Sequence, residues 1–125
     1  MSYGRTYVTP APRTLAVVSI GYADGLSGQL SGRVSFLLRG RQVPVVGRIC
    51  MDMCMVDVTD VPEARWGCRT VTCLGTGEDG APSACGLASQ LGTIPYEILC
   101  SISKRIPRIY LDGRKRRTEI LQYIV

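Results

Sequence analysis

The sequence predicts a mostly β fold, in the form of a compact antiparallel β-barrel-like domain with one or two short helices. Three observations lead to this prediction. The apolar stretches are mostly short runs rich in β-branched residues, separated by glycine-containing or charged turns. Helical spacing of apolar residues is confined to the part of the chain after residue 82. The length of 125 residues suits one domain with a modest core, and many short strands in such a domain are typical of a small barrel.

The first half of the chain is predicted to form strands. Residues 13–20 (RTLAVVSI) are a nearly continuous apolar run, which is typical of a strand buried on both faces. Residues 32–47 hold two apolar segments around Gly40, which predicts a hairpin whose glycine has a positive φ. Residues 49–61 alternate over part of their length and predict another strand. Its two faces would be Asp52, Cys54, Val56 and Val58 on one side, and Met51, Met53, Met55 and Asp57 on the other.

Two helices are predicted in the second half. Ser83 is a suitable N-cap for the first of them, and Gly92 is a suitable stop. Thr93 is the predicted N-cap of the second helix, and Pro95 falls in its first turn, where a missing N–H does little harm. Pro107 is expected to end this helix.

The remaining segments are predicted as strands and turns. Residues 69–75 (RTVTCLG) read as a strand, and the glycine-rich residues 75–82 that follow read as a flexible turn. Residues 108–111 and 118–125 are apolar enough to close the domain with two further strands.

Composition and charge exclude several classes of function. The formal net charge is +5, but the basic residues cluster only in the short turn 114–117 and are otherwise scattered, so we expect no binding to nucleic acid. No apolar run approaches the roughly 18 residues of a membrane span, and the start lacks a signal-peptide pattern. The sequence therefore predicts a cytoplasmic protein that does not associate with membranes.

The six cysteines are better explained by packing than by chemistry. The chain contains no CxxC motif and no histidine, so the usual zinc spacings are missing and we predict no metal site. Without histidine there is also no Ser–His or Cys–His pair for nucleophilic catalysis. Asp52 and Asp57 could serve a hydrolase, but two aspartates in one strand are only weakly diagnostic. Reduced cysteines in the core are the favoured interpretation.

Three stretches together carry a resemblance to a known family. They are SIGYADG at 19–25, VVGRICMDM at 45–53 and GTIPYEILCSISKRIPRIY at 92–110. In this order and spacing they resemble the C-terminal domain of bacterial alanine racemases, over a match that runs from about Tyr3 to Tyr110. The resemblance implies an isomerase that interconverts L- and D-alanine for cell-wall peptidoglycan.

The same resemblance draws attention to a missing part. Alanine racemases carry pyridoxal phosphate on a lysine of an N-terminal (β/α)8 barrel, and residues 1–125 contain no such barrel. Lys104 and Lys115, the two lysines, lie outside the family's cofactor-lysine motif. We therefore expect an excised fragment that begins at an added Met1, is inactive alone and does not bind the cofactor by itself. A natural stand-alone paralogue is the alternative.

The resemblance assigns roles to particular residues. Racemisation needs two acid–base groups on opposite sides of the substrate α-carbon. One of them in the family is the barrel lysine, and the other is the tyrosine of the GYxDG motif, which reaches into the partner subunit and matches Tyr22. Met51 matches a methionine whose backbone N–H holds the substrate carboxylate, and Tyr96 matches a tyrosine that contacts the cofactor phosphate. The residues that match the approach to the site are Arg48, Asp52 and Ile94.

Plainer interpretations exist for each of these residues. A tyrosine at a strand end often caps a core, a methionine in an apolar run often packs, and charged residues at strand ends are usually solvated.

The resemblance also bears on substrate and partners. Tyr96 favours alanine over serine as the substrate, because a tyrosine would crowd a hydroxymethyl group. The expected partners are the N-terminal barrel of the same subunit and that of the partner subunit in a homodimer. A stand-alone module that only docks onto another protein is the rival hypothesis, and a serine racemase is another.

Overall fold

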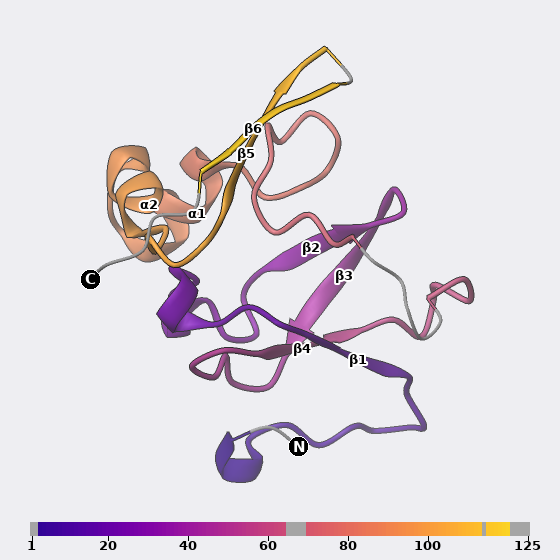
Figure 1. The fold of residues 1–125 in the computed structure, drawn as a ribbon. Coiled ribbons are helices and arrows are strands. Elements are labelled where there is room, and N and C mark those ends of the chain that lie inside the picture. The colour runs from indigo at the N-terminus through magenta and orange to yellow at the C-terminus, as the bar shows by residue number, and fades with distance from the viewer. Residues whose placement is uncertain (1–2, 65–69, 114, 121–125) are drawn as a thin grey trace.

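An open antiparallel sheet of four strands forms the centre of the fold (Figure 1). The computed structural model describes residues 3–64, 70–113 and 115–120. The four strands are β1 (Leu15–Val18), β2 (Ser35–Leu38), β3 (Arg41–Val46) and β4 (Cys54–Asp57). Their order is β1-β4-β3-β2, so β1 and β2 are the edges and do not pair with each other. The prediction of a mostly β, antiparallel fold is confirmed, but the described strands leave the sheet open instead of closing it into a barrel.

The other elements follow the sheet in the sequence. Two helices, α1 (Ala84–Leu91) and α2 (Pro95–Ser101), are succeeded by the hairpin of β5 (Arg108–Asp112) and β6 (Lys115–Ile120). Three short 3-10 turns complete the described structure: η1 (Tyr3–Arg5), η2 (Tyr22–Asp24) and η3 (Gly28–Leu30). Figure 1 shows α1, α2 and the β5–β6 hairpin on one side of the molecule, away from the N-terminal segment.

Strand β1 is an edge strand, which corrects one expectation. Its single neighbour is β4, with Leu15 opposite Asp57 and Val18 opposite Cys54. Val17 is 65% exposed, so the prediction that this run is buried on both faces is wrong. A continuous apolar run can be a fully buried strand, but the run by itself does not show whether another layer covers the second face.

The β2–β3 hairpin agrees with the prediction. Its turn contains Arg39 and Gly40, whose φ angles are 49° and 75°. This left-handed pair is the conformation that a two-residue hairpin turn requires, and Gly40 adopts it without the steric penalty of a Cβ. The register places Leu38 opposite Arg41, directly beside the turn.

Strand β4 is shorter than predicted because a turn precedes it. The Cys50 N–H donates to the Met53 carbonyl at 2.9 Å, and this bond closes a turn that contains Met51 and Asp52. The strand then begins at Cys54. Cys54, Val56 and Val58 share one face, as predicted, and the structure shows that this face is buried. Asp52 was assigned to the same face, but it lies in the turn and is exposed.

The core lies between the sheet and the helices. Phe36 and Val56 are fully buried in the sheet, and Leu87, Ala88 and Ile98 contribute from α1 and α2. Burial of apolar surface of this kind is the main force that holds the helices on the sheet. The predicted strand at 69–75 is only partly confirmed: within residues 70–75 the structure shows isolated bridges, such as Leu37 to Thr72.

The helix boundaries follow local capping. The Ser83 hydroxyl accepts the Gly86 N–H at 3.0 Å, and Gly92 has φ 70°, so both predicted ends of α1 are confirmed. The predicted N-cap of α2 is wrong: Ile94 occupies that position, and the Thr93 hydroxyl donates to the Glu97 carboxylate instead.

Helix α2 also ends earlier than predicted. It stops at Ser101, whereas the sequence suggested that it continues to Pro107. The Ser103 N–H donates to the Asp24 carbonyl at 3.1 Å, and this bond takes the chain out of the helix towards η2. The early end of α2 is therefore a tertiary effect. Two C-terminal strands are present as predicted, but β6 begins at Lys115, inside the predicted basic turn 114–117, and ends at Ile120. Residues 121–125 lie outside the described part of the chain.

The described cysteines are all free thiols, in three different environments. Cys54 is buried, Cys50 and Cys73 are partly buried, and Cys85 and Cys100 are exposed, while Cys68 lies outside the described residues. The interpretation as reduced core residues thus holds for Cys54 but is wrong for the two exposed thiols. Burial, with a smaller contribution from Cys50, raises the pKa of Cys54 to about 11. Burial, with a smaller contribution from Cys54, raises the pKa of Cys73 to about 12.

Asp57, the last residue of β4, is held by an ion pair and by hydrogen bonds. The Asp57 carboxylate accepts the Thr59 N–H at 3.0 Å and also the Thr59 hydroxyl, and it lies 3.5 Å from the Arg13 guanidinium. Burial opposes ionisation of this carboxyl, but the bonds from Thr59 and the charge of Arg13 outweigh it and lower the pKa of Asp57. The ionised Asp57 therefore stabilises the fold above about pH 3.9, the ordinary aspartate pKa. This contribution is lost as the pH falls through the lowered pKa of the folded state.

In the described part of the chain, no helix has the length and apolar character that crossing a membrane would need.

The first prediction concerns thiol reactivity. Iodoacetamide at neutral pH should label Cys85 and Cys100 in the native protein, because the thiolate is the reactive form and both thiols are exposed. Cys54 and Cys73 should react only after unfolding in urea. Mass spectrometry of the labelled peptides measures both sets in one sample. Equal labelling of Cys54 and Cys85 in the native state would contradict the burial described above.

The second prediction concerns acid stability. Asp57→Asn should unfold at a lower urea concentration than the parent at pH 7, because the charge that Arg13 and Thr59 stabilise is gone. The difference should shrink as the pH falls below the ordinary aspartate pKa and through the lowered pKa of Asp57, where the parent aspartate also becomes neutral. Asp60→Asn is the matched control, because Asp60 is exposed and its described contact, with Arg41, is made through the carbonyl. A difference that persists unchanged in acid would rule out the charge as its cause.

Candidate active site

The η2 turn presents Tyr22 at the surface. The Tyr22 N–H donates to the Cys50 carbonyl at 3.0 Å, and the Ala23 N–H donates to the Met51 carbonyl at 2.9 Å. These two bonds join the turn after β1 to the turn before β4. The Tyr22 side chain is 53% exposed, so it projects from this joint and does not cap the core.

Gly21 makes that joint possible. A Cβ atom at this position would lie 2.2 Å from the Cys50 carbonyl oxygen and 2.4 Å from the Met51 carbonyl carbon. Backbone atoms cannot move aside as the end of a flexible side chain can, so only glycine fits here. Gly25 is restricted in a similar way, since it has φ 109° and a Cβ there would lie 2.4 Å from the Ser101 carbonyl oxygen. The two glycines of the motif thus allow close backbone contact on both sides of Tyr22.

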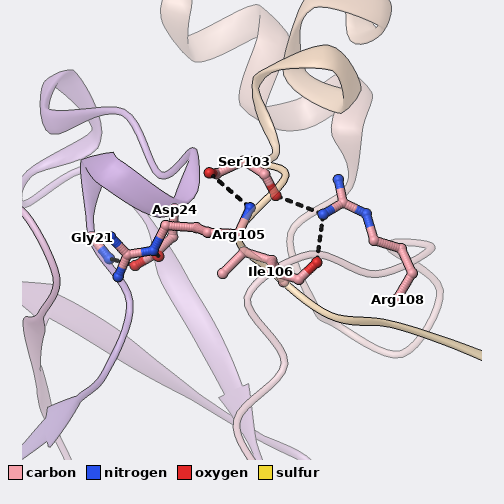
Figure 2. Close-up of polar contacts among 6 residues, drawn as sticks. All are labelled: Gly21, Asp24, Ser103, Arg105, Ile106 and Arg108. Atoms are coloured by element: carbon pink, nitrogen blue, oxygen red, sulfur yellow. Dashed lines mark hydrogen bonds and ion pairs between the residues drawn. The ribbon is translucent and has the colours of Figure 1, made fainter. Parts of the chain in front are cut away.

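Asp24 is the buried charge of this turn, and sequence analysis did not identify it as a site residue. One carboxylate oxygen accepts the Gly21 N–H at 2.9 Å, and the other lies 3.0 Å from Nε of Arg105 (Figure 2). Asp24 is only 6% exposed. Its signal in the sequence was an aspartate three residues after a glycine at a predicted turn, a spacing at which a side chain can bond back to the turn. Arg105 had no comparable signal, because its partner lies far away in the chain.

Most of the predicted residues meet at one groove of about 680 Å³. Its lining includes Tyr22, Arg48, Met51 and Asp52. Within the described residues the Met51 N–H donates no hydrogen bond, while the Met51 carbonyl accepts one from Ala23. Met51 as a residue is 57% exposed. A backbone N–H without a protein acceptor is suited to bind an anionic oxygen such as that of a carboxylate.

Asp52 lies in the turn that carries Met51, and Arg48 lies two residues before that turn. Both are exposed, in keeping with the expectation that they lie on an approach to the site. The Arg48 guanidinium extends towards η1, where a Cβ on Gly4 would lie 3.8 Å from one of its nitrogens. The plainer interpretation of these two residues as solvated strand-end charges fits the same geometry.

Tyr96 and Ile94 lie elsewhere, at the exposed start of α2. They are 75% and 58% exposed. A second groove, of about 580 Å³, separates η2 from the helices and is lined by Tyr22 together with Thr93 and Glu97. The structure therefore brings Tyr22 close to α2 but does not place Tyr96 or Ile94 in either groove. Sequence spacing could assign these residues to a helix start, but it could not show which way that start faces.

No group of three or more cysteine, aspartate and glutamate side chains that could hold a metal ion occurs among the described residues.

A known family matches nearly the whole chain. The family model described as "Alanine racemase, C-terminal domain" matches residues 1–110. An alanine racemase from Desulfosudis oleivorans is 50% identical over 113 residues, which are 90% of this chain and 29% of that enzyme. An alanine racemase from Clostridium perfringens is 44% identical over 124 residues, which are 99% of this chain and 31% of that enzyme.

Solved structures give the same picture. The alanine racemase of Clostridium difficile in complex with cycloserine superposes with a TM-score of 0.86 at 38% identity, and the match covers 96% of this chain and 31% of that one. The alanine racemase of Bartonella henselae, with covalently bound pyridoxal phosphate, superposes with a TM-score of 0.68 at 37% identity and covers 82% of this chain and 29% of that one. The chain thus spans between 29% and 31% of the length of these relatives.

The third prediction tests the joint beneath Tyr22. Gly21→Ala should destabilise the domain by about 1–3 kcal/mol, the usual effect of forcing an extra carbon into a packed place. Gly28→Ala is the matched control, since nothing lies within 4 Å of a Cβ at that position. Urea unfolding of the two variants beside the parent measures the difference. If Gly21→Ala were as stable as Gly28→Ala, the close contact with residues 50–51 would not be a constraint.

Proposed function

This chain belongs to the alanine racemase C-terminal domain family, and we propose that it is the tyrosine-bearing domain of a pyridoxal-phosphate-dependent alanine racemase. The enzyme would interconvert L- and D-alanine in the cytoplasm and so supply D-alanine for peptidoglycan. The observation that carries this proposal is the exposed Tyr22, which stands on a backbone joint beside the Met51 N–H. The domain would span residues 1–125.

The residues present fit one side of a pyridoxal phosphate site. The lining of the two grooves contains no lysine to hold the cofactor covalently. The exposed hydroxyl of Tyr96 and the Met51 N–H are donors of the kind that phosphate and carboxylate oxygens accept. The covalent attachment would therefore come from a barrel domain, and we expect this chain alone to bind no cofactor.

Tyr22 would act as one of the two acid–base groups. When bound, pyridoxal phosphate withdraws the electron pair left on the α-carbon as its proton departs. The Tyr22 oxygen would take the α-proton from one face of alanine, or return it in the reverse direction, while a barrel lysine serves the opposite face. The half-exposed side chain supports this role, because the oxygen can reach a substrate held by another domain.

The neighbouring residues would hold and admit the substrate. The Met51 N–H would donate to the substrate carboxylate, and Tyr96 would contact the cofactor phosphate. Arg48, Asp52 and Ile94 would line the approach. Arg48 and Asp52 share a groove with Tyr22, which supports their part, whereas Ile94 is supported only by its exposed place beside Tyr96.

This arrangement implies partners. Tyr22, Met51 and Tyr96 are each more than half exposed, and Met53 and Leu99 are close to half exposed. Exposed apolar side chains favour association with another surface. We propose that the surface around Tyr22 and Met51 is completed by the barrel of the partner subunit in a homodimer, and that the domain is also joined to a barrel of its own. A module that only docks has the same apolar surface but gives Tyr22 no role, so activity separates the two hypotheses.

The choice of substrate rests on Tyr96. In the proposed site its ring would leave room for the methyl group of alanine and crowd the hydroxymethyl group of serine. A racemase for serine or another small amino acid is the alternative, and relative turnover of L-alanine and L-serine by the assembled enzyme would decide between them.

The fourth prediction concerns Tyr22 in an assembled enzyme. A chimera would join this chain to the barrel of the Desulfosudis oleivorans racemase, whose own C-terminal region is 50% identical to it. With pyridoxal phosphate the chimera should racemise L-alanine, and Tyr22→Phe should lower the rate by about 10²–10⁴-fold, the usual contribution of an acid–base group. Tyr110→Phe is the matched control, because Tyr110 is 53% exposed, as Tyr22 is, but lies in β5.

Two results would contradict the proposal. One is a chimera whose racemase activity survives Tyr22→Phe, since Tyr22 would then not be a base. The other is racemisation by this chain alone, because that activity would require a cofactor site on one of its own lysines.

A further inference from the structure

An ion pair ties the tyrosine turn to a distant segment. Asp24 is the one buried charged residue in the described part of the chain, and both of its carboxylate oxygens have partners (Figure 2). One accepts the N–H of Gly21, the residue directly before Tyr22, and the other lies 3.0 Å from Nε of Arg105. The Asp24 carboxylate thus links the guanidinium group of Arg105 to the backbone of the tyrosine turn.

The segment that carries Arg105 is itself held in place. The Arg108 guanidinium donates to the carbonyls of Ser103 and Ile106, at 2.6 Å each, and to that of Ile102 at 3.1 Å. Figure 2 shows Arg108 on the far side of this turn from Asp24. The Ser103 N–H also donates to the Asp24 carbonyl. Arg105 therefore reaches Asp24 from a turn whose backbone is fixed by Arg108.

The position of the Tyr22 ring depends on the same turn. Within the described residues its hydroxyl makes no hydrogen bond, and the side chain is half exposed. The backbone bonds of residues 21–25 are then what sets the direction of the ring. A change in those bonds would move the hydroxyl, even though neither Asp24 nor Arg105 touches it.

We propose that Asp24 and Arg105 are positioning residues for Tyr22, and that the turn after α2 sets the reach of the tyrosine oxygen. This inference rests on the proposed function of Tyr22. An ionised carboxylate shielded from water is unfavourable when its cation is removed, so the η2 turn would rearrange to expose Asp24 to solvent. Arg105 is the better residue to change, because its own side chain is 57% exposed and its loss leaves no cavity in the core.

The test measures each face of the substrate separately, in the chimeric holoenzyme with its full barrel. L-alanine and D-alanine are incubated separately in deuterated water, and the initial rate of α-hydrogen exchange is followed by proton magnetic resonance. Tyr22→Phe should abolish exchange for the one enantiomer whose α-hydrogen faces the tyrosine and leave exchange of the other. Arg105→Gln should lower exchange of that same enantiomer by about 10- to 100-fold, the effect of a small misplacement of a catalytic group.

Two matched variants accompany Arg105→Gln. Lys104→Gln removes the positive charge of the exposed residue directly before Arg105. The α-hydrogens of both enantiomers should exchange at the parent rates in this variant. Arg105→Lys keeps the charge beside Asp24 and should recover most of the lost exchange. The ratio of the two exchange rates is taken in one preparation of each variant, so partial unfolding lowers both rates and leaves the ratio unchanged.

The outcomes separate the two levels of inference. A selective loss in both Tyr22→Phe and Arg105→Gln supports the positioning role. A selective loss in Tyr22→Phe with an unchanged ratio in Arg105→Gln overturns this inference and leaves the proposed function standing. An unchanged ratio in Tyr22→Phe overturns the proposed function, and the positioning role is overturned with it.

Discussion

The structure depends on one backbone contact, in which residues 21–23 lie directly against residues 50–51. In this contact the N–H groups of Tyr22 and Ala23 donate to the carbonyls of Cys50 and Met51. The contact exists because Gly21 has no side chain, and a single added carbon would overlap the facing carbonyl groups. Beyond this contact, β1 and β4 continue as paired strands. The end of the sheet and the candidate site are therefore one structure, and neither can shift without the other.

Polar pairs reinforce the places where distant segments meet. Asp24 is buried with Arg105 where the turn after α2 reaches η2, and Asp57 is held by Thr59 and Arg13 at the other end of β4. The candidate functional residues are treated differently, since Tyr22, Met51 and Tyr96 stay exposed. The ion pairs thus hold the frame of the domain, and the candidate functional side chains stay accessible to solvent.

Much of this could be predicted from sequence where the cause is local. The β2–β3 turn at Gly40 and the caps of α1 at Ser83 and Gly92 follow from residues next to each other in the chain. The errors fall where tertiary contacts decide. Helix α2 ends at Ser101, where Ser103 bonds to Asp24. The open sheet could not be predicted, because the strand pattern does not show which edges pair. The motif around Tyr22 could be found in the sequence. The pairing of its aspartate, Asp24, with Arg105 could not, because the spacing between these two residues carries no periodic signal.

The contacts around Tyr22 also have a consequence for the order of folding. The Ser101 hydroxyl bonds to the Gly25 carbonyl across 76 residues of chain, and the bonds of Ser103 and Arg105 to Asp24 span a similar separation. Closing such long loops is entropically unfavourable until many other contacts have formed, and contacts of high sequence separation slow folding. During synthesis, the tyrosine turn emerges before α2 and the turn after it. The geometry of the site can therefore form only after residues 101–105 have been made.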